Sequence, residues 1–406
     1  MENNIAPELR FPEFEGEWEE KKLGDIAEIS SGGTPKRTQM SYWNGIIPWV
    51  STGLINYNLI LETDEYITYD GLINSSAKLF PKGTILMAMY GQGKTRGKVS
   101  ILGIEASTNQ ACAALQLKNS LSINFVYSHL AKDYNRIRNI ANDGGQQNLS
   151  LGLIKSLKIF IPSLSEQTKI ATFLTTVDQR INLLEKKKTH LEQYKKGVMQ
   201  KLFPPKGEQT PEIRFKKEDG TDYPAWEEKK IKELFSFKQG VQCGIEKQSL
   251  IKNDGQIRFI RIVDLTKNDE PIRYIDDPGK EHRIYNNDLF MVRYGNAGLI
   301  GYNYQGVIAN NLFKILPINE NLIDNQFYFF VFTIMQRKLE ALASSSTMPA
   351  LNFKSLEGLK LPFPTKKEQQ KIAAFLSAID KKIERTQEQI VGMQEWKKGL
   401  LQKMFV

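Results

Sequence analysis

Pro162-Ser163-Leu164-Ser165-Glu166-Gln167-Thr168-Lys169-Ile170-Ala171 opens a segment of this sequence that occurs twice. The segment returns as Pro364-Thr365-Lys366-Lys367-Glu368-Gln369-Gln370-Lys371-Ile372-Ala373. The two copies stay in step without a gap as far as Lys201-Leu202-Phe203 and Lys403-Met404-Phe405, so each position has its counterpart 202 residues later. A long repeat at a fixed offset indicates two copies of one structural unit.

Each copy is predicted to form one long α-helix. Ser163 with Glu166, and Thr365 with Glu368, match the capping box, in which the hydroxyl accepts a backbone N–H and the carboxylate reaches back to another. A proline outside each box prevents an earlier start. A helix from Glu166 to Phe203 is about 57 Å long at 1.5 Å per residue.

A narrow apolar stripe follows each predicted helix. Its residues recur at intervals of three and four, which indicates a coiled-coil seam, while the other faces carry Lys, Glu and Gln. A buried core helix is the alternative. We expect the two helices to pair antiparallel and to separate two domains.

The repeat extends beyond the helices to the whole chain. Pro7-Glu8-Leu9-Arg10-Phe11 returns as Pro211-Glu212-Ile213-Arg214-Phe215, and Trp18 to Leu23 resembles Trp226 to Ile231. The expected divisions are a first domain at 1–161, a helix at 162–203, a linker at 204–222, a second domain at 223–363 and a second helix at 364–406. Short β-branched runs and further helical stretches in the two bodies predict an α+β fold with an internal pseudo-twofold repeat. Near-identical helices beside divergent loops suggest one frame that carries two different recognition surfaces.

Composition limits the classes of protein that fit. The 406 residues carry a net charge of +9, which favours a polyanionic partner. No apolar run is long enough for a membrane span, and the polar start lacks a secretory signal, so we expect a cytoplasmic protein without a membrane partner. Cys112 and Cys243 lie far apart and the three histidines do not cluster, so no metal site is expected.

Several loops combine glycine, amide and basic residues. Gly91-Gln92-Gly93-Lys94-Thr95 resembles the end of a phosphate-binding loop, but Ala88 occupies the position of the required glycine and the next residues predict a strand. A DNA-contacting loop, in which Lys and Arg hold phosphates and Gln or Arg reads base edges, fits better than a nucleotide site. A solvated basic hairpin is the third alternative.

The same reasoning applies to the loop at Gly32-Gly33-Thr34-Pro35 and to the pair Asn109-Gln110, matched with Asn310-Asn311, although plain turns explain both as well. The predicted DNA-contacting residues are Lys36, Arg37, Tyr90, Gln92, Lys94, Thr95, Arg96, Lys98, Asn109, Gln110, Gln146, Gln239, Gln242, Arg261, Arg293, Tyr294, Asn296 and Asn310. No catalytic constellation is visible: the sequence lacks Asn-Pro-Pro-Tyr, Gly-x-Ser-x-Gly and a paired His and Cys. No catalytic residue is therefore expected.

The repeated Glu-Gln-x-x-Ile-Ala-x-Phe-Leu segments, together with Gly32-Gly33-Thr34-Pro35, resemble the specificity subunit of type I restriction-modification enzymes. The resemblance covers the full chain. It implies a non-catalytic DNA-binding subunit with two target recognition domains, which recognises two unlike half-sites separated by a fixed spacer. The second half lacks the Gly-Gly-Thr-Pro loop, so the resemblance implies no matching loop contacts there.

The resemblance also implies partners and their cofactors. Two modification subunits are expected to carry S-adenosylmethionine, and restriction subunits to use ATP and Mg, while this chain needs no cofactor. Helix residues proposed to bind those subunits are Ile170, Phe173, Leu174, Val177, Ile181, Ile372, Phe375, Leu376, Ile379 and Ile383. The alternatives are a coiled-coil scaffold with incidental basic charge and a stand-alone nucleotide-binding enzyme.

Overall fold

Segments from both ends of the chain build the first of two compact units in the computed structural model. The first unit contains residues 1–186 and 387–406, and the second contains residues 187–386. The structure describes residues 6–91, 94–118, 121–140, 148–205, 207–267, 269–343 and 350–406. Each unit therefore combines one α+β body with half of each long helix.

The body of the first unit is built on two larger sheets. One has the strand order β2-β10-β7-β8-β4 and the other β5-β3-β9-β6, while β1 pairs with β11. The bounds are β1 Glu19–Lys22, α1 Leu23–Ile26, β2 Ala27–Ser31, η1 Met40–Tyr42, β3 Trp43–Val50, η2 Thr52–Leu54, β4 Leu59–Ile60, β5 Glu65–Ile67, α2 Tyr69–Ile73, β6 Leu79–Phe80, β7 Ile85–Ala88, β8 Val99–Leu102, β9 Ala106–Thr108, β10 Cys112–Leu117, α3 Ile123–Lys132, α4 Tyr134–Asn139, α5 Leu151–Ser156 and β11 Lys158–Ile161.

The body of the second unit repeats this plan. Its sheets have the orders β13-β20-β17-β18 and β15-β14-β19-β16, and β12 pairs with β21. The bounds are β12 Glu227–Lys230, α7 Ile231–Leu234, β13 Phe235–Gln239, η3 Ile245–Lys247, β14 Gln256–Ile260, α8 Val263–Thr266, β15 Arg273–Asp276, η4 Lys280–His282, β16 Arg283–Ile284, β17 Leu289–Val292, β18 Ile300–Gly301, β19 Gly306–Ile308, β20 Leu312–Pro317, α9 Asn325–Ile334, α10 Gln336–Ala343, α11 Phe353–Glu357 and β21 Lys360–Phe363. Both bodies contain a parallel strand pair, β3 with β9 and β14 with β19, and the first body has a second one, β4 with β8.

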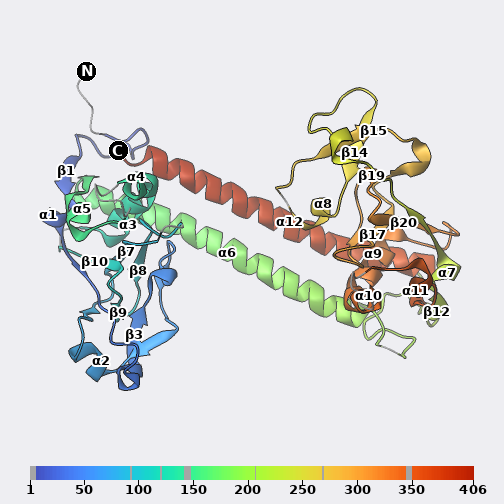
Figure 1. Ribbon diagram of the computed structural model, residues 1–406, viewed down its shortest axis with the longest axis horizontal. Coiled ribbons are helices and arrows are strands. Elements are labelled where there is room, and N and C mark those ends of the chain that lie inside the picture. Colours follow the sequence, from blue (N-terminus) through green and yellow to red (C-terminus); the bar gives the residue numbers. More distant parts are fainter. Residues whose placement is uncertain are drawn as a thin grey trace. The chain divides into compact units, whose positions relative to one another are not determined.

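The two long helices confirm the main prediction from the repeat. Helix α6 spans Leu164–Leu202 and α12 spans Lys366–Lys403. Within the first unit, the start of α6 and the end of α12 run in opposite directions (Figure 1), and Lys397 pairs with Asp178 at 2.6 Å. Within the second unit, Lys195 at the end of α6 makes the equivalent pair with Asp380 of α12 at 2.5 Å. No helix in the described ranges meets the length and hydropathy needed for a bilayer span.

An aromatic triad completes the core of each unit. In the first, Trp18 lies edge-on to Phe125, and Phe405 from the end of α12 packs against both rings. In the second, Trp226 and Phe327 receive Phe203 from the end of α6. The helix that starts on one body therefore ends in the core of the unit that holds the other body.

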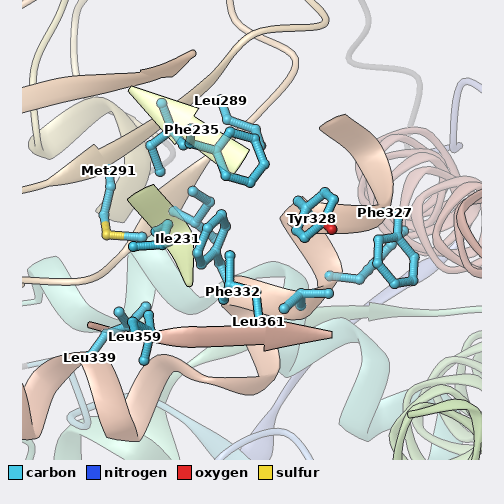
Figure 2. Packing of buried hydrophobic residues seen from close by; sticks show 14 of the residues in the cluster. Ile231, Phe235, Leu289, Met291, Phe327, Tyr328, Phe332, Leu339, Leu359 and Leu361 are labelled. Carbon is cyan, nitrogen blue, oxygen red and sulfur yellow. The ribbon is translucent and has the colours of Figure 1, made fainter. Parts of the chain in front are cut away.

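Larger clusters of buried side chains surround the triads. Figure 2 shows the cluster of the second unit, where Phe235, Leu289 and Met291 of the sheet face Phe327, Tyr328 and Phe332 of α9. Burying a side chain of this size stabilises the fold by about 1.5–3 kcal/mol.

His129 is specific to the first unit. Its ring is 1% exposed and packs against Phe405, at the position where the second unit has Val331. Its Nε2 accepts the backbone N–H of Phe160, at 3.3 Å. Burial lowers the pKa of His129 to about 4, although the nearby Asp133 carboxylate opposes this shift.

The predicted capping box forms in one half at the first helix, and at the second helix the N–H of Glu368 donates to the backbone carbonyl of Thr365. The Ser163 hydroxyl accepts the N–H of Glu166 at 3.4 Å, as expected. The Glu166 carboxylate, however, does not return to its own cap: Nε and Nη2 of Arg10 donate to its two oxygens, both at 2.8 Å. Arg214 holds Glu368 in the same way, at 2.7 and 3.0 Å. Glutamate is needed here because a buried, bidentate carboxylate anchors the segment at Arg10 or Arg214 to the helix start.

The following glutamine also has a structural role. Gln167 Nε2 donates to the carbonyl of Pro162, and its Oε1 accepts the N–H of Ser122 at the start of α3. Gln369 makes the same bonds to Pro364 and Asp324. The repeated Glu-Gln pair therefore ties each long helix to its own body.

Candidate functional site

Three loops meet at one edge of the first body. The N–H of Gly33, after β2, donates to the carbonyl of Thr108 at 2.8 Å. The N–H of Met89, after β7, donates to Ala111 at 2.8 Å, and the N–H of Leu149 donates back to Met89 at 2.9 Å. A Cβ on Gly32 would lie 2.0 Å from the Thr108 oxygen, so this close crossing requires glycine.

The second body has the same backbone arrangement. Val241 donates to Ile308 at 2.9 Å, Arg293 donates to Asn311 at 2.8 Å, and Leu351 donates to Arg293 at 3.0 Å. A Cβ on Gly240 would lie 2.2 Å from the Ala309 oxygen, as at Gly32. The two bodies thus present the same three-loop frame, defined here by residues 31–34, 89–91 with 94–98, and 109–111 in the first body and by residues 239–242, 293–299 and 309–311 in the second.

The hydrogen bonds of this frame correct one pairing of residues between the two halves that was made from the sequence. Asn109 donates its backbone N–H to Val50, and Ala309, not Asn310, makes the equivalent bond to Ile260. Gln110 is therefore the counterpart of Asn310, one position away from the predicted match. The Asn109 side chain accepts from the N–H of Ala111 and donates to Thr52, so it stabilises the turn, which was the alternative interpretation.

The side chains on the second frame form one connected network. Gln239 Nε2 donates to the carbonyl of Asn310 at 2.8 Å, and its Oε1 accepts from Arg293 Nη1 at 2.8 Å. Arg293 Nε donates to the carbonyl of Leu351 at 3.3 Å. The guanidinium carbon lies 5.0 Å from the centre of the Tyr294 ring and 5.1 Å from that of Phe353. Asn296 and Gln242 are exposed on the neighbouring loops.

The first frame carries different side chains. Thr34, the counterpart of Gln242, donates its hydroxyl to Gln110 Oε1 at 2.5 Å. Met89 replaces Arg293 and is buried, whereas Tyr90 and Lys94 are exposed and Thr95 is half-buried. A shared frame with different polar groups can present two different patterns of hydrogen-bond donors and acceptors.

Three predicted DNA-contacting residues make hydrogen bonds within the protein. Arg96 is 7% exposed and donates to the carbonyl of Arg138. Arg261 is committed to Asp264, through bonds at 3.0 and 3.3 Å, and to the carbonyl of Pro271. Lys98 donates to Asn56 Oδ1 at 2.7 Å. These three side chains are held by the protein.

Arg37 has a mixed environment. Its guanidinium lies 3.9 Å from the centre of the Trp43 ring and is paired with Glu65. Lys36 is exposed beside it. Gln92 and Gln146 fall outside the described residues.

The nucleotide-site alternative is not supported by the geometry. A phosphate-binding loop aims the start of a helix at its ligand, but Lys94 to Gly97 form turns and strand β8 follows. Among the described residues, no group of three His, Cys, Asp or Glu side chains could hold a metal ion.

The helix residues predicted to bind partner subunits are largely part of the chain's own core. Ile170, Leu174, Val177 and Ile181 belong to the buried cluster of the first unit, and Ile372, Leu376 and Ile379 belong to that of the second. Their side chains stabilise the chain's own fold, and their role in binding another subunit stays a prediction. Phe173, Phe375 and Ile383 are partly buried against the same clusters.

Sequence reasoning also missed important residues of the site. Phe353 lies under Arg293 and is itself stacked on Phe237, with ring centres 5.4 Å apart. Its signal was weak, because a single Phe in an Asn-Phe-Lys context resembles any helix start. Leu351 contributes only its backbone, which no side-chain pattern encodes.

The comparison with protein families decides between the remaining interpretations. A family model described as a type I restriction modification DNA specificity domain matches residues 15–193 and again residues 224–391. The chain belongs to this family. It is a DNA specificity subunit of a type I restriction-modification system, and such subunits are not catalytic themselves.

Individual relatives agree with this assignment. The specificity subunit of the type I restriction enzyme MjaIX from Methanocaldococcus jannaschii is 25% identical over 413 residues, which cover 96% of this chain and 92% of that subunit. The EcoR124I/EcoR124II specificity subunit from Escherichia coli is 29% identical over 180 residues, which cover 43% and 44% of the two chains. The solved S subunit from M. genitalium shares the fold over 99% of both chains, with a TM-score of 0.62 and 16% identity.

Proposed function

We propose that this specificity subunit recognises a bipartite double-stranded DNA target, with one half-site contacted by each three-loop frame. One observation carries the proposal: the two frames share their backbone hydrogen bonds but hold different side chains, Thr34 and Gln110 in one and Gln239, Arg293 and Asn310 in the other. Amide and guanidinium groups are the side chains that distinguish bases in the major groove.

Exposed and half-buried residues on and beside the frames would supply these contacts. In the first unit the proposed set is Lys36, Arg37, Tyr90, Lys94, Thr95 and Gln110. In the second it is Gln242, Arg293, Tyr294, Asn296 and Asn310, with Gln239 fixing Arg293. The lysines would contact phosphates, which position the protein without reading sequence.

The domain boundaries expected from the sequence remain part of the proposal. Bodies at 1–161 and 223–363 would carry recognition, the linker at 204–222 would connect them, and the helices at 162–203 and 364–406 would fix the number of base pairs between the half-sites. A continuous helix suits this role because its length per residue is constant.

The proposed partners are two modification subunits and the restriction subunits. They would supply S-adenosylmethionine, ATP and Mg chemistry, and the chain itself would act as the scaffold that brings them to the target. Partner contacts would use the outward faces of α6 and α12, because the apolar seam residues are buried.

Methylation-site mapping of the reconstituted complex tests the proposal. The purified chain and its modification subunits are incubated with a random DNA library, and methylated sequences are read out. We expect two unlike half-sites at a fixed spacing, and replacing residues 12–160 with those of a relative should change one half-site only. A change in both half-sites, or methylation without a bipartite pattern, would contradict it.

A further inference from the structure

We infer that Arg293 reads a guanine in the half-site bound by the second unit, and that Gln239, Leu351 and Phe353 are positioning residues for it. This inference rests on the proposed function and adds the chemical identity of one recognised base. It depends on the geometry of the network around the guanidinium.

The Arg293 guanidinium is fixed in place before any DNA arrives. Nη1 donates to Gln239 Oε1, and that amide is held in turn by its own bond to the carbonyl of Asn310. Nε donates to the carbonyl of Leu351. A side chain whose rotamer is already set loses little conformational entropy on binding, which favours specific recognition.

Aromatic rings support the guanidinium from below. Phe353 lies 5.1 Å from its central carbon and is anchored by Phe237 and by Phe313, whose ring centre is 5.1 Å away. Arginine stacks well on such rings because its guanidinium is planar and weakly hydrated. The Phe353 ring fixes the orientation of the guanidinium plane, and a bidentate contact needs that plane to be fixed.

The hydrogen-bond capacity of Arg293 is only partly used. A guanidinium has five N–H donors, and acceptors among the described residues take two of them, at Gln239 and Leu351. Three donors remain, and a bidentate contact needs two. Arg261, in the same unit, differs because Asp264 and Pro271 take three of its donors and Glu270 Oε1 lies 3.9 Å from Nη1, which carries the other two.

Guanine is the base that matches a group with donors alone. Its major-groove edge presents two acceptors, O6 and N7, whereas adenine presents one acceptor and one donor. The first unit lacks this feature, because buried Met89 occupies the equivalent position. The two half-sites should therefore differ at the base that this position reads.

Methylation mapping with matched variants tests the inference. The half-site of the second unit is assigned first, as the one that changes when residues 223–363 are exchanged for those of a relative. In the unmodified protein it should contain an indispensable guanine. Arg293→Met should reduce discrimination at that guanine by about 5- to 150-fold and leave the first half-site unchanged. Gln239→Leu should produce a smaller loss at the same position.

Arg293→Lys separates base recognition from phosphate binding. Lysine keeps the charge but cannot form the planar two-donor contact, so guanine discrimination should fall while the salt dependence of binding stays the same. A phosphate contact predicts the opposite for Arg293→Met: full discrimination, with a salt slope lower by about one.

Three results would overturn the inference. They are a second half-site with no required guanine on either strand, discrimination that survives both Arg293 variants, and relaxation in the first half-site. Failure of the proposed function can be distinguished from failure of this inference. In that case the complex with the original sequence would show no bipartite target, before any variant is compared.

Discussion

The buried ion pair between Arg214 and Glu368 should control how firmly the segment at 211–216 is attached to the start of α12. The Glu368 side chain is 0% exposed and that of Arg214 is 13% exposed. Glu368→Gln keeps the shape of the side chain but removes its charge. The Arg214 guanidinium is then left largely buried with only a neutral acceptor and the carbonyl of Pro224.

The structure gives the size of the effect. Breaking one side of a buried pair costs about 3–5 kcal/mol, and the partial exposure of Arg214 favours the lower value. A loss of about 3 kcal/mol raises the equilibrium constant for local opening by about 150-fold. Replacing both partners with methionine should cost less than the single change, because no uncompensated charge remains.

Native-state hydrogen exchange with mass spectrometry measures this opening. Peptides covering 211–216 and 366–376 should exchange faster in Glu368→Gln, while 7–12 and 164–174 in the first unit provide an internal control, since Arg10 and Glu166 are untouched. The matched variant Glu166→Gln should reverse the pattern. Unchanged exchange at 366–376, or equal acceleration in both units, would refute the reasoning.

Three further outcomes are expected. Because burial depresses the pKa of His129, its contribution to stability is present above pH 6.5 and lost as the pH falls toward 4; urea unfolding should show a loss of about 2 kcal/mol between pH 7.5 and 5, absent in His129→Val, which copies Val331. Phe203→Ala should cost about 3–5 kcal/mol in the same assay, whereas Tyr194→Ala, at a 54% exposed ring, should stay within about 0.5 kcal/mol. Four residues inserted near Lys187 add about 6 Å of helix and should lengthen the DNA spacer by about one to two base pairs of 3.4 Å; methylation mapping that finds the original spacing in an active variant would contradict this.

The sequence predicted the helices better than the tertiary contacts that they make. The repeat located both long helices within a few residues, because apolar spacing and a flanking proline are local signals. It could not show that Phe203 completes the core around Trp226, since an apolar stripe does not specify the surface that covers it. The Glu166 carboxylate was assigned to its own cap for the same reason: its partner, Arg10, lies 156 residues away in the chain.

The candidate site was predicted as a set of loops but not as a set of contacts. Gln239, Arg293 and Asn310 were selected for their chemistry, and the fold brings them into one network. Arg96 was selected on the same grounds and is buried, because the backbone path of the hairpin directs it inward. Residue type cannot distinguish Arg293 from Arg96, whereas the exposure of the two side chains in the structure does.

The aromatic triads also impose an order on biosynthesis. Trp18 and Phe125 lie in the body that leaves the ribosome first, yet the ring that completes their cluster is Phe405. The triad of that body stays incomplete until residue 405 has been translated. The triad of Phe203, Trp226 and Phe327 can form earlier. Unpaired apolar surface in a waiting domain favours aggregation. The first domain to be made is thus the last to be completed.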